Sequence, residues 1–197
     1  MLQVTRRRRS AFIVALVVVC TVAFASDAHA TTPGIAPVSE GVLDCRSPIG
    51  TAMALPDGVQ SLGGSVGVQT GQSGGRAALQ TSLDASAADP TTRYFAKSPL
   101  FVRTGAATAR IIVPSKWRGK LAVGWGNSGP VQPVSAAFTV GPCSASSRWI
   151  VFPGGFFLST PACISLTVVV GQRTDLVRVG VGKPCSGQRK PAQPSAS

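Results

Sequence analysis

The stretch that most constrains the fold is residues 163–185, CISLTVVVGQRTDLVRVGVGKPC. Two apolar runs flank a short polar turn, and a cysteine stands at each end. Alternation of apolar and polar residues is typical of β-strands with one buried face. A turn over residues 171–174 would pair three inward residues of one run with three of the other: Ile164 with Val181, Leu166 with Val179, and Val168 with Val177. Such a hairpin needs a second sheet over its apolar face, which the rest of the chain must supply.

The remaining sequence indicates further short strands separated by Gly and Pro, without sustained helical periodicity. Residues 108–113 and 120–125 are expected to form a hairpin, and Pro153-Gly154-Gly155 a tight turn. The other expected strands are residues 42–45, 50–55, 66–70, 76–83, 93–97, 100–103, 134–140 and 148–152. Roughly seven to nine strands at this spacing predict an all-β fold, specifically an immunoglobulin-like β-sandwich.

Composition divides the chain into segments. Residues 1–30 have the arrangement of a signal peptide, with arginines at 6–9, an apolar core and a cleavage signal that ends at Ala30. The apolar core is short for a bilayer span, which needs about 20 residues, so no transmembrane span is expected after cleavage. Sec and twin-arginine export remain open. The other segments are a flexible lead-in (31–41), N-terminal strands whose packing the pattern leaves open (42–92), the β-sandwich unit (93–185) and a disordered tail (186–197).

Four cysteines follow the predicted signal peptide: Cys45, Cys143, Cys163 and Cys185. An even number in an exported protein predicts two disulfides. Three pairings are possible, and spacing alone does not decide between them. We favour Cys143 with Cys163, which closes a short loop, and Cys45 with Cys185, which joins the start of the domain to its end. The absence of a CxxC pair disfavours a zinc site, and we expect neither a metal nor a cofactor.

The sequence also disfavours several kinds of catalysis. The only histidine, His29, lies in the predicted signal peptide, which removes imidazole from the mature protein. The segments GQSGG (71–75) and GNSGP (126–130) resemble the glycine-flanked serine of trypsin-like proteases, but without a general base we interpret them as turns. The carboxylates include no strand-spaced pair of the glycosidase kind. We therefore expect the protein not to be an enzyme.

Positive charge is concentrated in the second half of the chain. Without residues 1–30 the chain has 15 basic and 6 acidic residues, a net charge of +9, and from residue 93 onward Asp175 is the only acid. Such a field favours anionic surfaces, including phosphate-bearing wall polymers. The alternative is that scattered cations keep an exported β-protein soluble and protect its strand edges.

One turn combines this charge with an aromatic side chain. Trp117 lies between Lys116 and Arg118, with Lys120 close by, and an exposed indole beside cations suits carbohydrate or interface binding. We take these four residues as the candidate surface contact. Trp125 and Trp149, which lie in apolar strands, are expected in the core.

Several motifs of the C-terminal half form a series. They are RIIVP (110–114), WRG (117–119), Trp125-Gly126, Cys143, Trp149, FPGG (152–155), Cys163 and GVGKPC (180–185). The series resembles uncharacterised small exported β-domain proteins of high-GC Gram-positive bacteria. The resemblance implies an extracytoplasmic β-domain with two disulfides. It carries over no catalytic or binding residue.

Two hypotheses for function follow. The first is a non-enzymatic exported module, secreted or associated with the cell envelope, that binds an anionic cell-wall polymer or another envelope protein. The second is a secreted hydrolase inhibitor that presents a disulfide-braced loop such as residues 144–148. A nucleic-acid partner is not expected, because export and a single tyrosine argue against an aromatic binding face.

Overall fold

The structure is a computed structural model that describes residues 40–83, 89, 92–126 and 135–191. The predicted signal peptide, most of the predicted lead-in and residues 192–197 of the predicted tail lie outside the described residues. Those from residue 40 onward belong to one compact unit. This unit is built of strands and loops with a short 3₁₀ turn, η2 (Ser115–Trp117), and contains no α-helix among the described residues. The all-β prediction is confirmed.

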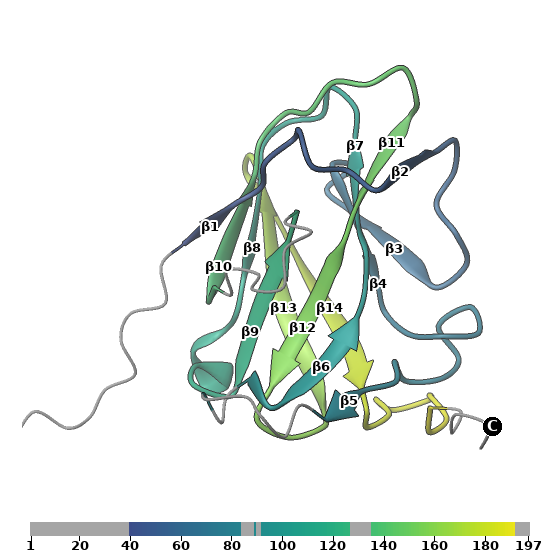
Figure 1. The fold of residues 1–197 in the computed structure, drawn as a ribbon, viewed down its shortest axis with the longest axis vertical. Coiled ribbons are helices and arrows are strands. Elements are labelled where there is room, and N and C mark those ends of the chain that lie inside the picture. The colour runs from purple at the N-terminus through teal and green to yellow at the C-terminus, as the bar shows by residue number, and fades with distance from the viewer. Residues whose placement is uncertain (1–39, 84–88, 90–91, 127–134, 192–197) are drawn as a thin grey trace, which may run out of the picture. The chain divides into compact units, whose positions relative to one another are not determined.

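Within the described residues, fourteen strands form three sheets (Figure 1). Sheet A consists, in spatial order, of β1 (Gly41–Val42), β10 (Ala137–Val140), β8 (Ala109–Ile112), β13 (Ala162–Val170) and β14 (Arg173–Val181). Sheet B consists of β2 (Gly50–Ala52), β11 (Trp149–Phe152), β7 (Leu100–Arg103), β4 (Val66–Gln69) and β3 (Val59–Leu62). Sheet C consists of β5 (Ser82–Leu83), β6 (Tyr94–Lys97), β12 (Gly154–Leu158) and β9 (Leu121–Trp125). This strand order does not establish the immunoglobulin-like topology.

Sheets B and C are joined because two strand pairs follow one another in the same register, β6 with β12 in sheet C and β7 with β11 in sheet B. Lys97 lies opposite Gly155 and Leu100 opposite Phe152, so the register of β6 with β12 continues unchanged into that of β7 with β11. This register places Pro99 opposite Pro153. Because proline has no backbone N–H, the ladder is interrupted at this point and divides into two sheets. The predicted tight turn at residues 153–155 is therefore wrong: the chain continues from β11 into β12 without reversing.

Sheets A and C are joined at both edges. Val123 of β9 and Ser135, just before β10, exchange two backbone hydrogen bonds of 3.0 and 2.8 Å. At the other edge the N–H of Leu79 donates to the carbonyl of Gly180 at 2.7 Å, and the N–H of Gly182 donates to the carbonyl of Leu79 at 2.8 Å. A few residues after Leu79, β5 pairs with β6. Backbone hydrogen bonds thus link sheets A and C at two places, and each link covers part of a strand edge.

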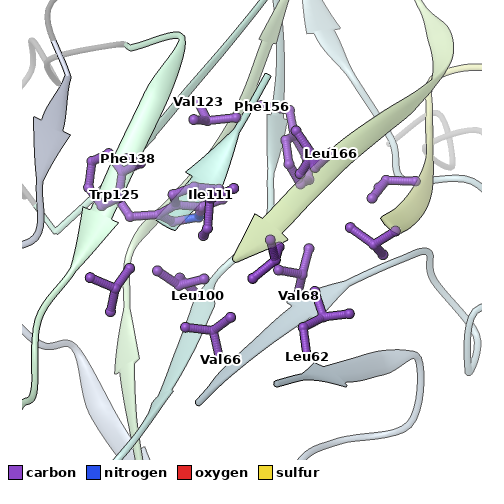
Figure 2. Close-up of a cluster of buried hydrophobic side chains, with 14 of the residues drawn as sticks. Leu62, Val66, Val68, Leu100, Ile111, Val123, Trp125, Phe138, Phe156 and Leu166 are labelled. Carbon is purple, nitrogen blue, oxygen red and sulfur yellow. The ribbon is translucent and has the colours of Figure 1, made fainter. Parts of the chain in front are cut away.

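One hydrophobic core lies between the sheets (Figure 2). Trp125 is central to it: its ring meets those of Phe138 and Phe156 edge to face at 5.5 and 5.9 Å, and its Nε1 donates to the carbonyl of Ser98 at 2.8 Å. Trp125 is 3% and Trp149 5% exposed, as the sequence predicts. Leu62, Val66 and Val68 from the N-terminal strands lie in the same core, so these strands are part of one domain with residues 93–185.

The hairpin of β13 and β14 forms as predicted, but its register differs. Ile164 pairs with Val179, Leu166 with Val177, and Val168 with Asp175. The loop is the two residues Gly171 and Gln172, and Gly171 has a φ of 57°, which suits the tight hairpin turn. The pairing is offset by two residues from the prediction, so every inward residue remains on the predicted face.

The predicted hairpin of residues 108–113 and 120–125 is wrong. Strand β8 pairs with β10 and β13 in sheet A, whereas β9 pairs with β12 in sheet C. The connection between them, which includes η2, crosses from one sheet to the other. The inward residues of both strands are buried in the same core as expected, but they belong to two different sheets.

Both disulfides are present, with pairings that differ from the expected ones. Cys45 bonds to Cys143 and Cys163 bonds to Cys185. The first pairing follows from a parallel alignment, because Val42 of β1 lies opposite Thr139 of β10 and both strands then lead to their cysteines. Two disulfides indicate an oxidising environment.

Both ends of the described chain are held more firmly than predicted. Glu40 and Gly41, which the sequence places in a flexible lead-in, are fixed by an ion pair with Arg110 and by strand β1. At the other end Arg189 donates from its N–H to the carbonyl of Arg76 at 2.8 Å and accepts from the N–H of Ala78 at 3.0 Å. The prediction of disorder is therefore wrong for Arg189.

Candidate functional site

The turn that carries the predicted contact residues has a defined backbone. After β8 the chain passes Pro114 and enters η2. Three backbone bonds then fix the turn: Trp117 N–H to the carbonyl of Pro114 at 2.9 Å, Arg118 N–H to Ser115 at 3.1 Å, and Lys120 N–H to Trp117 at 3.0 Å. Pro114 is the N-cap of η2, with φ −58° and ψ 153°, and its lack of a backbone N–H leaves no donor unpaired at this position. The side chain of Trp117 is consequently held in a definite place.

The indole of Trp117 lies on the outer face of sheet A. It is half-buried and packs against the edge of the core, and its Nε1 donates to the hydroxyl of Ser165 at 3.3 Å. Ser165 is on β13, and its neighbours Ile164 and Leu166 point into the core, so its own side chain points outward. The expectation of a fully exposed indole is thus corrected: part of the ring is accessible and its N–H has a partner.

Several exposed cations lie in the same turn as this indole or on a strand paired with β13. Lys116, Arg118 and Lys120 are exposed, and the ammonium of Lys116 lies 6.0 Å from the centre of the Trp117 ring, at the outer limit of a cation–π contact. The structure adds Arg178, which is exposed on β14 directly opposite Ser165. We call the set of Lys116, Trp117, Arg118, Lys120 and Arg178 the Trp117 surface. No local pattern pointed to Arg178, because only the strand register brings it next to the turn.

Three of the five carboxylates among the described residues form ion pairs away from the Trp117 surface. The three ion pairs in that part of the chain join Arg46 to Asp44, Arg110 to Glu40, and Arg173 to Asp175, and none involves the Trp117 surface. The hydrogen bonds of Arg110 and Thr139 lower the pKa of Glu40. The N–H of Gly63, followed by Arg173, lowers the pKa of Asp175. The charge of the Trp117 surface is therefore available to an external anion.

The loop proposed for the inhibitor hypothesis is also braced. Residues 144–148 connect sheets A and B, and residues 144–146 are exposed. Cys143, at the base of the loop, is bonded to Cys45, and the hydroxyl of Thr104 donates to the carbonyl of Ser147 at 2.6 Å. The loop is held at both ends, although by a different disulfide from the expected one.

Other kinds of site receive no support from the described residues. They contain no group of three or more metal-ligating side chains and no helix long and apolar enough to cross a membrane. The segment at 71–75 is a turn in which Gln72 pairs with Ala77, as expected, whereas most of the 126–130 segment lies outside the described residues. Comparison with protein-family models and with curated protein sequences returns no match.

Proposed function

We propose that this protein is a non-enzymatic, exported binding module that attaches to an anionic polymer of the cell envelope through the Trp117 surface. The observation that carries this proposal is that four exposed cations, Lys116, Arg118, Lys120 and Arg178, lie near one half-buried indole. None of the four takes part in an ion pair of the described residues. A cationic surface attracts phosphate-bearing or carboxylate-bearing polymers over a distance of about 8–10 Å at physiological salt. The partly exposed ring offers an apolar face to a sugar ring. Within this proposal the domain has the immunoglobulin-like β-sandwich organisation that the strand spacing predicts.

Sedimentation with isolated Gram-positive cell wall tests the proposal. The variant Lys116→Gln/Arg118→Gln/Lys120→Gln should remain in the supernatant under conditions in which the unmodified protein sediments. The control variant Arg93→Gln/Lys97→Gln/Arg103→Gln loses the same charge from three other exposed positions: just before β6, in β6 and in β7. It should sediment like the unmodified protein. Equal sedimentation of both variants would show that net charge, and not this surface, determines retention.

A second function, inhibition of a hydrolase, is favoured by the braced loop at 144–148. An inhibitor presents a rigid exposed segment to an active site, and this loop is tied at its base by the Cys45–Cys143 disulfide. Titration of purified protein against a panel of serine and cysteine proteases would reveal it as a stoichiometric loss of activity. Residual activity that is independent of the protein concentration would remove this function from consideration.

A further inference from the structure

The outer edge of β14 presents backbone N–H and carbonyl groups that do not take part in the ladder with β13. Backbone groups of successive strand residues point alternately to the two edges of a strand. The carbonyl of Gly180 and the N–H of Gly182 bond to Leu79, so the even-numbered residues point away from β13. The odd-numbered residues therefore form the ladder with β13. Thr174, Leu176 and Arg178 direct their N–H and carbonyl groups to the outer edge.

Only one end of this edge is covered. Leu79 occupies the positions beside Gly180 and Gly182, and no other strand of the described chain pairs with that side of β14. Thr174, Leu176 and Arg178 are exposed, and Leu176 retains 64% of its accessible surface. The result is an open segment of edge, from Thr174 to Arg178, in the longest hairpin of the molecule (β14 is yellow in Figure 1). Unpaired strand edges bind further strands readily.

The geometry makes a second copy of this chain a poor occupant of the edge. An antiparallel copy with Leu176 opposite its own equivalent would place Gln172 of one chain opposite Gly180 of the other. Leu79 already occupies the position beside Gly180. A shift by two residues avoids Leu79 but places Asp175 opposite its own equivalent, and like charges directly opposite each other are destabilising. A shift by four residues leaves only residues 172–176 of each chain to pair. The net positive charge of the chain adds to this repulsion.

The side chains of the edge indicate what a foreign strand should contain. Leu176 offers an apolar contact, and Arg178 belongs to no ion pair of the described residues. Asp175, the only acid of β14, already accepts the N–H of Gly63 at 2.7 Å and the Nε of Arg173 at 3.1 Å. An acidic side chain opposite Arg178 would be stabilised, whereas a basic one would find no free carboxylate. We propose that the open edge of β14 binds an extended acidic peptide segment of another protein by adding it to sheet A as a further strand.

Amide hydrogen exchange with a defined peptide tests this proposal. The probe is a soluble peptide with the core Glu-Thr-Val-Thr-Glu, and the control peptide has Lys in place of Glu. In the free protein the amides of Leu176 and Arg178 should exchange quickly, and those of Val177 and Val179 slowly. The acidic probe should slow exchange at Leu176 and Arg178, and the basic peptide should leave it unchanged. Fast exchange at both residues with saturating probe would overturn the proposal. Slow exchange in the free protein would also overturn it, because the edge would then already be occupied.

Proline variants separate this edge from other surfaces. Leu176→Pro removes an outward N–H that the ladder with β13 does not use, so the fold should be retained. This variant should weaken binding of the acidic probe by at least about tenfold, a change of ~1.4 kcal/mol. The matched control is Ser61→Pro on β3, the edge strand of sheet B, which should bind the probe normally. Equal binding by both variants would contradict the proposal. Because Lys116, Arg118 and Lys120 are unchanged in Leu176→Pro, its sedimentation with cell wall reports on the Trp117 surface separately.

Discussion

At the scale of the residue, Gln188 has the most extensive side-chain hydrogen bonding near the end of the described chain. Its Nε2 donates to the carbonyls of Thr70 at 3.1 Å and Gly75 at 2.9 Å, and its Oε1 accepts the N–H of Cys185 at 3.0 Å. A Cβ on Gly180 would clash with that Oε1, so glycine suits this position and lets the amide fit. We expect Gln188→Ala to lower the free energy of unfolding by about 1–3 kcal/mol, because backbone groups lose their partners.

Urea unfolding followed by tryptophan fluorescence measures this effect. The matched control is Gln60→Ala, which removes an exposed glutamine side chain from β3. We expect it to change stability by less than about 0.5 kcal/mol, as surface substitutions usually do. Equal stability of the two variants would mean that residues 185–189 are not held by this side chain.

A second residue-scale prediction concerns Asp175. Hydrogen bonds from Gly63 and Arg173 lower its pKa in the folded protein relative to the unfolded chain. A group with a lowered folded pKa contributes stability above its unfolded pKa, and this contribution is lost as the pH falls through the folded pKa. The protein should therefore lose stability below about pH 4, where an unperturbed aspartate begins to be protonated.

Thermal unfolding of the Asp175→Asn variant tests this assignment. Above pH 5 the variant should melt at a lower temperature than the unmodified protein, and the difference should shrink as the pH falls below 4. Asp57→Asn, in an exposed turn, serves as the control for a general effect of charge. A difference between Asp175→Asn and the unmodified protein that stays constant from pH 7 to pH 2 would refute the assignment.

At the scale of the element, sequence alternation predicted which residues face the core but not which strands are neighbours. The inward residues of β8 and β9 are buried as expected, yet these strands belong to different sheets. Alternation is a property of one strand, whereas pairing depends on the path of the connection between two strands. The connection here contains η2, which leads the chain from sheet A to sheet C. The hairpin register was missed for a related reason: a two-residue loop and a four-residue turn leave the same residues inward.

The disulfides could be predicted in number but not in pairing. Spacing along the chain favoured short-loop closure, whereas the observed Cys45–Cys143 bond follows from a parallel contact between β1 and β10. In the chain-entropy model, loops of 98 and 22 residues correspond to about 5 and about 3 kcal/mol of stabilisation. We therefore expect Cys45→Ser/Cys143→Ser to destabilise the protein more than Cys163→Ser/Cys185→Ser.

Peptide mapping without reduction comes before that comparison. It should recover Cys45 linked to Cys143 and Cys163 linked to Cys185. Chemical denaturation of both double variants then ranks the two losses. A larger loss for the Cys163 and Cys185 pair would show that native contacts of the C-terminal segment, and not restriction of the unfolded chain, determine the contribution of the disulfides.

At the scale of the whole molecule, the Trp117 surface is assembled from two parts of the chain, the turn at residues 116–120 and strand β14. Four of its residues were found from one local turn, because an aromatic side chain between cations is visible in the sequence. Arg178 and the hydrogen bond to Ser165 were not predictable, because both depend on how β8, β13 and β14 align in sheet A. The pairing of β8, β13 and β14 in sheet A and the backbone bonds of the turn hold these elements together, so the surface should be rigid before it meets a ligand.

The most direct test of polymer binding uses the three tryptophan indoles as reporters. The ¹⁵N-labelled protein is titrated with inorganic polyphosphate, a simple anionic polymer, and the indole N–H signals are followed by NMR. The signal of Trp117 should shift, those of the buried Trp125 and Trp149 should stay in place, and the shift should disappear at high salt. Binding of polyphosphate that leaves the Trp117 signal unmoved would contradict the proposal that this surface is the site of attachment.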